Sequence, residues 1–168
     1  RKLWYAASFL TSPVKLKLIK TLIIPLIIYG ANVYGDLDAT SQHKLQVTIN
    51  NCARFVFNKR KFDHISNLSH KILGFELKTF LNIRNLIFTH KLITTRSPEY
   101  LFESLRFAVS ARTCNLVIPT HRYLTSSRMF FVNAARLWNN LPHNLKNECN
   151  HNKFKAKLYN LYSNSLIT

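Results

Sequence analysis

The sequence predicts a mainly α-helical fold, on the basis of its composition and of its apolar patterning. The 168 residues include only three Gly and five Pro, fewer than an all-β design needs for its turns. The hydrophobic fraction of 47% is enough to bury a core. Apolar residues recur at helical spacing through most of the chain. We therefore expect a helical bundle over residues 1–61, followed by further helices over residues 62–168.

The first predicted helix covers residues 13–30. Ser12 is the expected N-cap, and Pro13 follows it at the first helical position, where a missing N–H loses no helical partner. Pro25 is expected to kink this helix, and Gly30 to end it. The helix should therefore be bent but continuous.

Two helices with one apolar face each make up the first region. On the first, Leu18, Leu22 and Leu26 form the expected inward stripe. Lys17, Lys20 and Thr21 are expected on the opposite face. The second predicted helix, residues 41–57, has an inward stripe made of Leu45, Ile49, Cys52 and Val56, with Asn50 and Arg54 behind it.

The second region should begin with a short helix over residues 63–74, capped by Asp63 or Ser66 and closed by Gly74. Residues 76–96 are apolar nearly all round, so this helix is expected to lie centrally. Arg84 and Lys91 fall within its apolar stripe, so they require acidic partners, carbonyl groups or a position at its edge. Another short helix is expected over residues 97–105.

The C-terminal part returns to helix after an interruption. Residues 107–126 lack a helical period, so we expect an irregular connector with a possible short strand at "NLVIP". A helix over residues 130–141 is expected to end at Pro142. Its inward stripe comprises Phe130, Ala134, Leu137, Trp138 and Leu141. The last helix, residues 152–164, should turn Phe154, Leu158, Leu161 and Tyr162 inward.

The charge balance indicates a polyanionic partner. Lys and Arg number 24 against seven Asp and Glu, so the net charge is +17. Such an excess is self-repulsive unless nucleic acid or another anionic surface relieves it. The side chains that we expect to contact phosphates are Lys15, Lys17, Lys20, Arg54, Lys59, Arg60 and Lys61. The alternative function is a helical interaction domain that docks on an acidic protein or an anionic membrane surface.

No catalytic residue, metal site or cofactor is predicted for this chain. The closest acidic pair, Asp36 and Asp38, fits a loop before a helix cap better than a metal site. No Gly-rich phosphate loop is present. Four potential zinc ligands, Cys114, His121, Cys149 and His151, do not have the spacing of a zinc finger or knuckle. The apolar stretch 21–35 is shorter than the ~20 residues of a membrane span, so none is expected.

The chain is expected to be a piece of a longer, intracellular protein. It begins on Arg1, and its only methionine is Met129. Its three cysteines are too few and too scattered for a disulfide framework, which fits a reducing compartment.

Five stretches, in this order, resemble the C-terminal part of reverse transcriptases of non-LTR (LINE-like, jockey-type) retrotransposons: "KLKLIKTLIIPLIIYGANVYG", "LQVTINNCARFV", "ILGFELKTFLNIRNLIFTHKLITTRSPEYL", "RMFFVNAARLWNNLP" and "FKAKLYNLY". The resemblance covers almost the whole chain. The positions that match the family pattern are Pro25, Tyr29, Gly30, Gln46, Arg54, Arg84, Lys91, Ser97, Pro98, Tyr100, Leu101, Trp138, Asn139, Leu141 and Pro142. Tyr34 departs from it, since the family more often has Trp there.

The resemblance implies that residues up to about 61 are similar to the polymerase thumb, which grips the template–primer duplex, and that the rest is similar to the segment beyond it. The family's catalytic Tyr-x-Asp-Asp turn and other palm carboxylate have no counterpart here. This chain alone is therefore not expected to synthesise DNA. Its parent is expected to be a nuclear, magnesium-dependent RNA-directed DNA polymerase, whose palm domain is a partner of this chain.

Overall fold

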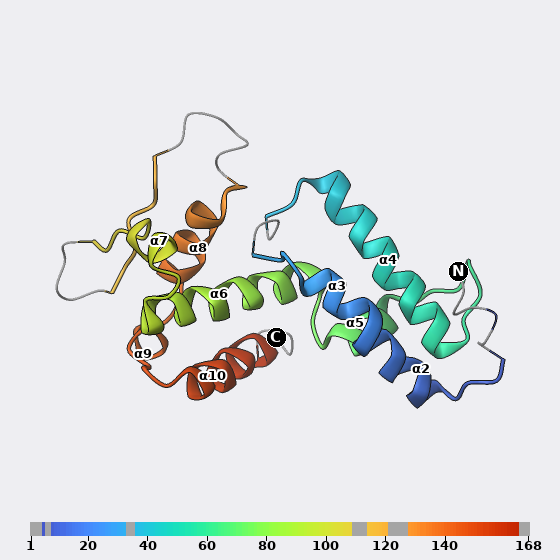
Figure 1. The fold of residues 1–168 in the computed structure, drawn as a ribbon. Coiled ribbons are helices and arrows are strands. Elements are labelled where there is room, and N and C mark those ends of the chain that lie inside the picture. Colours follow the sequence, from blue (N-terminus) through green and yellow to red (C-terminus); the bar gives the residue numbers. More distant parts are fainter. Residues whose placement is uncertain (1–4, 6–7, 33–35, 109–113, 121–127, 165–168) are drawn as a thin grey trace. The chain divides into compact units, whose positions relative to one another are not determined.

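The computed structural model describes residues 5, 8–32, 36–108, 114–120 and 128–164 (Figure 1). Within them the protein is helical and contains no strand, which confirms the mainly α fold class. The helices are α2 (Ser12–Leu18), the π-helical segment η1 (Ile19–Ile23), α3 (Ile24–Ile28), α4 (Ala39–Phe57), α5 (Ser66–Leu73), α6 (Leu77–Thr95), α7 (Glu99–Glu103), α8 (Phe130–Asn139), α9 (His143–Lys146) and α10 (His151–Asn164).

The chain forms two compact units. Unit 1 comprises Arg1–Gly30 and Leu37–Phe80, and unit 2 comprises Ala31–Asp36 and Leu81–Thr168. The boundary predicted at residue 61 falls inside unit 1, because α5 packs against α4. Helix α6 begins in unit 1 and continues in unit 2.

A π-helical turn interrupts the first helix and changes which residues face the core. Pro25 has no N–H to donate to the carbonyl four residues earlier, and a wider turn just before a proline accommodates this loss. The turn spans η1, so the buried positions advance by five residues, from Ile19 to Ile24. The predicted stripe is therefore wrong at Leu22 and Leu26, which are exposed.

The ends of the unit 1 helices only partly match the predicted caps. Asp38 caps α4, and its Oδ2 accepts from the backbone N–H of Ser41 at 3.2 Å, as the loop-before-cap interpretation requires. Gly74 closes α5 in the left-handed conformation, with φ +82°. The other two predicted N-caps are wrong, since Thr11 precedes α2 and Ile65 precedes α5.

The core of unit 1 lies between the first helix, α4 and α5. Its buried members are Ile19, Ile24, Ile27, Ile49, Cys52, Ala53, Phe55, Val56 and Ile72. The predicted stripe of α4 is confirmed at Ile49, Cys52 and Val56, while Leu45 is only partly buried. Burial also raises the pKa of the Cys52 thiol, so this cysteine is a core residue rather than a nucleophile.

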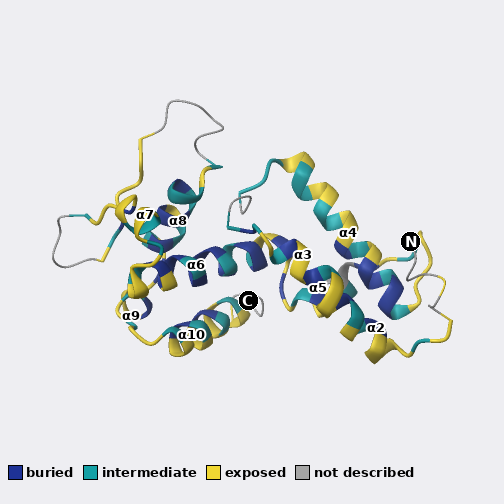
Figure 2. Ribbon diagram, viewed as in Figure 1, coloured by how far each residue is buried: buried dark blue, intermediate teal, exposed yellow. Residues whose placement is uncertain are grey.

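In unit 2, α6 is buried along most of its length, as Figure 2 shows. Lys91 is exposed and Arg84 is half-buried, so both lie at the edge of the apolar stripe. The buried polar residues of α6 are instead Asn85, Thr89 and His90. The Thr89 hydroxyl donates to the backbone carbonyl of Asn85 at 2.9 Å, so this buried hydroxyl has its hydrogen-bond partner within the helix.

Helices α8 and α10 contribute aromatic rings to the core of unit 2. Trp138 and Phe154 are buried with their ring centroids 6.2 Å apart. Residue Leu158 is buried as predicted, but Leu161 is 38% exposed. Pro142 ends the preceding segment as expected, yet a further short helix, α9, starts directly after it.

Where the structure describes the connector, at residues 107–108 and 114–120, it has a single β-bridge in place of the possible strand. Phe107 pairs antiparallel with Leu116. The Asn139 side chain then completes the pairing on the other side, because its Oδ1 accepts from the Leu116 N–H and its Nδ2 donates to the Leu116 carbonyl, both at 2.8 Å. Three basic residues of the connector, Arg112, His121 and Arg122, lie outside the described residues.

Candidate nucleic-acid interface

The basic segment 59–61 leaves the C-terminal end of α4 through a defined cap. Asn58 adopts the left-handed conformation, with φ +53°, which Asn tolerates better than most residues. The Lys59 N–H donates to the carbonyl of Arg54 at 3.0 Å. The direction in which the segment leaves the helix is thereby set by backbone hydrogen bonds.

A hydrogen-bonded turn follows at residues 60–63. The Asp63 N–H donates to the Arg60 carbonyl at 3.2 Å, and the Arg60 N–H donates to Asp63 Oδ2 at 2.9 Å. Lys59, Arg60 and Lys61 are all exposed. We name residues 59–63 the basic turn. It presents three consecutive cations on an ordered backbone, an arrangement suited to contacts with phosphates.

Lys15, which the sequence places among the phosphate contacts, is buried instead. Its side chain is 1% exposed, its Nζ donates to Asn58 Oδ1, and the same atom lies 5.5 Å from the centre of the Phe55 ring. The long aliphatic stem packs in the core while the ammonium reaches the C-terminal end of α4, where the helix dipole favours a cation. Lys15 therefore supports the basic turn rather than contacting a ligand.

Replacing Lys15 by methionine tests this role against the original prediction. Methionine keeps the apolar stem and most of the volume, so the free energy of unfolding should fall by less than about 1.5 kcal/mol. The salt dependence of nucleic-acid binding should stay unchanged, because a buried side chain releases no counterion. The matched variant Lys61→Met should flatten the log–log salt slope by about 0.9. Equal flattening in both variants, measured by fluorescence anisotropy, would contradict the buried role.

Among the described residues, no side-chain contact joins the remaining predicted cations to the basic turn, and Arg54 meets it only through its backbone carbonyl, which accepts from the Lys59 N–H. Lys17 and Lys20 are exposed on the first helix. Lys17 follows Lys15 by two residues, so it lies on the far side of α2 from the contact with Asn58. Arg54 is half-buried and donates to Asn51 at 3.3 Å. The basic turn is thus the one compact part of the predicted surface.

An exposed apolar stripe lies beside Lys17 and Lys20 on the first helix. Leu22, Leu26 and Tyr29 are 51%, 71% and 85% exposed. These are the side chains that the π-helical turn directs away from the core. Apolar side chains at such spacing on one helix are typical of a surface that another molecule covers.

Sequence reasoning missed one residue of the basic turn. Phe62 directly follows Lys61 and is 89% exposed, more than any other large apolar side chain that the structure describes. Its position between a run of cations and a turn-forming aspartate was the signal that pointed to a solvent-facing ring.

A polar groove of about 470 Å³ also lies on unit 1, between α4 and α5. Gln46, a position of the family pattern, lines it and donates from its Nε2 to Asn50 Oδ1 at 2.9 Å. Its other lining side chains are Ala39, Gln42, His43, Ile65, His70 and Glu76. Since these include a carboxylate and neither Lys nor Arg, the groove is not suited to phosphate.

A comparison of the chain with models of protein families, with curated proteins and with solved structures yields no match. In the part of the chain that the structure describes, no helix combines the length and the apolar character needed to cross a membrane. The same residues include no group of three His, Cys, Asp or Glu side chains placed to hold a metal ion. His121, one of the four zinc candidates, lies outside them.

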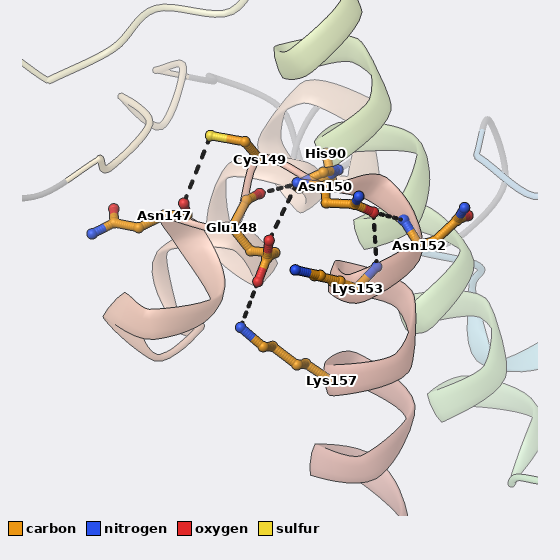
Figure 3. Close-up of polar contacts among 8 residues, drawn as sticks. All are labelled: His90, Asn147, Glu148, Cys149, Asn150, Asn152, Lys153 and Lys157. Atoms are coloured by element: carbon orange, nitrogen blue, oxygen red, sulfur yellow. Dashed lines mark hydrogen bonds and ion pairs between the residues drawn. The ribbon is translucent and has the colours of Figure 1, made fainter.

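The residues next to Cys149 have a structural role in unit 2 (Figure 3). Asn150 caps α10, since its Oδ1 accepts from the N–H groups of Asn152 and Lys153 at 3.0 and 3.2 Å. Glu148 pairs with Lys157, and the hydrogen bond from Lys157 lowers the pKa of the Glu148 carboxyl. These contacts join the start of α10 to its second turn.

The buried side chain of His90, on α6, contacts the residues that precede α10. Its Nε2 lies 2.7 Å from the Glu148 carbonyl oxygen, which can only accept, so Nε2 carries the proton. Its Nδ1 lies 3.1 Å from Nδ1 of His151, and its ring stacks on Phe154 with centroids 4.0 Å apart. Burial lowers the pKa of His90. Burial, then the nearby charges of Lys155, His90 and Lys91, lower the pKa of His151.

Unit 2 should consequently lose stability in mild acid. The pKa of both imidazoles is lower in the folded state than the ordinary value of 6.5, so as the pH falls the unfolded chain takes up protons before the folded chain does. The stabilisation is complete above that pH and is lost as the pH falls below it. Thermal unfolding followed by circular dichroism between about pH 7.5 and about pH 5 measures the effect. His90→Phe should reduce this pH dependence and the exposed control His43→Asn should not; the opposite ranking would contradict the assignment.

Proposed function

We propose that the chain binds nucleic-acid duplexes through the phosphate backbone, using the basic turn as its main contact. The net charge of +17 and the three exposed cations of the turn support this. Lys17, Lys20 and Arg54 are secondary contacts in the proposal. Backbone contacts of this kind give affinity and orientation without reading base sequence.

We further propose that the chain is the thumb and post-thumb part of a non-LTR retrotransposon reverse transcriptase. The ordered set of matching stretches supports this proposal, and so does the helical character that it implies. In this proposal the chain itself is not an enzyme. Its parent carries the palm carboxylates, holds magnesium, and works on element RNA in the nucleus.

The observation that carries the proposed function is the run of exposed cations on the hydrogen-bonded turn 60–63. Titrating the chain against a duplex of about 20 base pairs at several salt concentrations tests it. Three phosphate contacts give a log–log slope of about −2.7, and six give about −5.4. A flat slope would refute phosphate contact.

The exposed stripe of Leu22, Leu26 and Tyr29 favours a second candidate, a docking surface for an acidic protein or an anionic membrane. Lys17 and Lys20 are exposed on the same helix, before the stripe in sequence, and helices that combine exposed apolar residues with cations are typical of those that lie on anionic surfaces. In the reverse-transcriptase proposal, the same stripe would instead pack against the upstream palm domain.

Vesicle sedimentation separates the two candidates. Binding to vesicles that contain phosphatidylserine, with no binding to duplex, would favour the membrane candidate. A Leu26→Asp variant should then lose vesicle binding, because it places a negative charge within the stripe. Duplex binding that is insensitive to Leu26→Asp would favour the phosphate-contact proposal.

A further inference from the structure

We propose that Phe62 is a stacking platform for an unpaired base, so that the basic turn also holds single-stranded nucleic acid. This inference rests on the proposed function, which concerns duplex phosphates, and adds a second class of ligand. Base stacking on an aromatic ring beside cations is a common mode of single-strand recognition, and it tolerates any sequence because every base has a π-face.

The ring of Phe62 is accessible, and the backbone of the turn that carries it is hydrogen-bonded. Phe62 is 89% exposed, so one face of its ring is open to a ligand. The two hydrogen bonds between Arg60 and Asp63 close the turn on either side of the ring. A side chain on an ordered turn loses less conformational entropy when a ligand binds than one on an irregular loop.

Cations lie next to Phe62, where a single strand would need them to contact its phosphates. Lys61 Nζ lies 5.5 Å from the centroid of the Phe62 ring. The ammonium thus occupies one side of the ring and leaves the other for a base. Lys59 and Arg60, also exposed, precede it and are available to the phosphates that flank the stacked nucleotide.

The surroundings of Phe62 distinguish it from the apolar stripe of the first helix. The stripe consists of three exposed side chains on one helix, Leu22, Leu26 and Tyr29, and such a stripe suits a broad apolar partner. Phe62 instead stands alone between Lys61 and Asp63. A planar ligand that carries negative charge fits such a setting better than an apolar protein surface does.

Anisotropy titrations with a labelled oligo-dT of about 12 nucleotides and with a duplex of about 20 base pairs test the inference. Phe62→Ala should weaken single-strand binding by about tenfold, and Phe62→Trp should retain it. Duplex affinity should change by less than about twofold, since paired bases are not free to stack. Phe9→Ala is the control, because Phe9 is 88% exposed but has no charged neighbour in sequence.

The outcomes separate this inference from the proposed function. Binding of both ligands with equal affinities for wild type and Phe62→Ala would overturn the stacking role and leave phosphate contact intact. Equal losses for single strand and duplex would also overturn it, because stacking is specific to unpaired bases. Absence of binding to either ligand by the wild type would refute the proposed function and the inference together.

Discussion

Replacing Trp138 by alanine is expected to lower the free energy of unfolding of unit 2 by about 3–5 kcal/mol, the range for removing a large aromatic side chain from a core. Trp138 is 1% exposed and packs near Phe154 and His90. Its loss would leave a cavity between α6, α8 and α10 that rigid neighbours cannot fill.

The same substitution should also release the connector at residues 114–116. The indole Nε1 of Trp138 donates to the Cys114 carbonyl at 2.8 Å. Neighbouring Asn139 holds Leu116 through two hydrogen bonds, and Lys146 Nζ donates to Asn115 Oδ1 at 2.8 Å. The motif "RLWNNLP" therefore fastens an irregular segment to a helix.

Urea unfolding followed by circular dichroism measures the loss in the free energy of unfolding. Arg136→Ala is the matched control, because Arg136 lies on the same helix but is exposed, and its loss should change stability by no more than about 0.5 kcal/mol. The loss in stability for Trp138→Phe should lie between the losses for Trp138→Ala and Arg136→Ala. An unfolding midpoint for Trp138→Ala equal to that of Arg136→Ala would contradict the core role.

The second large effect concerns the basic turn. Changing Lys59, Arg60 and Lys61 together to alanine should weaken duplex binding on the order of 500-fold at about 0.1 M salt, because each of the three lost phosphate contacts removes about 0.9 log units of affinity relative to about 1 M salt. Stability should be nearly unchanged, since all three side chains are exposed.

A charge-matched variant is needed to interpret this result. Lys44, Lys71 and Lys78 are exposed on α4, α5 and α6 of the same unit. Replacing these three by alanine removes the same net charge without touching the turn, so affinity should fall much less. Equal losses in both triple variants would mean that overall charge, and no particular site, governs binding.

Local signals in the sequence predicted several features of the fold correctly. The loop that precedes α4, the Gly74 terminus and the inward stripe of α4 each depend on a residue and its near neighbours along one helix. Such features require no knowledge of what packs against the helix.

The errors arose where tertiary contacts or backbone irregularities decide the outcome. The π-helical turn lengthens the spacing between buried positions to five residues, from Ile19 to Ile24, so Ile24 and Ile27 are buried while Leu22 and Leu26 are exposed. A regular helical period cannot reveal such a shift. Lys15 and Ile19 are four residues apart, so they lie on one face of the helix. A stripe built on Ile19 instead of Leu18 would therefore have predicted the burial of Lys15.

The candidate site was predictable only in outline. The run "NKRK" identified three exposed cations, and its proximity to a helix end followed from the pattern of residues 41–57. The hydrogen bonds that order the turn, and the exposure of Phe62, depend on how residues 60–63 fold back on themselves. Composition carries no information about that geometry.

The central claim is that the basic turn contacts phosphates, and the salt dependence of duplex binding tests it most directly. Comparing the wild type with the turn variant and with the charge-matched variant gives three log–log slopes. The account predicts that the log–log slope of the turn variant, with Lys59, Arg60 and Lys61 changed to alanine, is flatter than the wild-type slope by about 2.7. The slope of the charge-matched variant should lie within about 1 of the wild-type slope. A turn variant whose slope equals that of the wild type would contradict it.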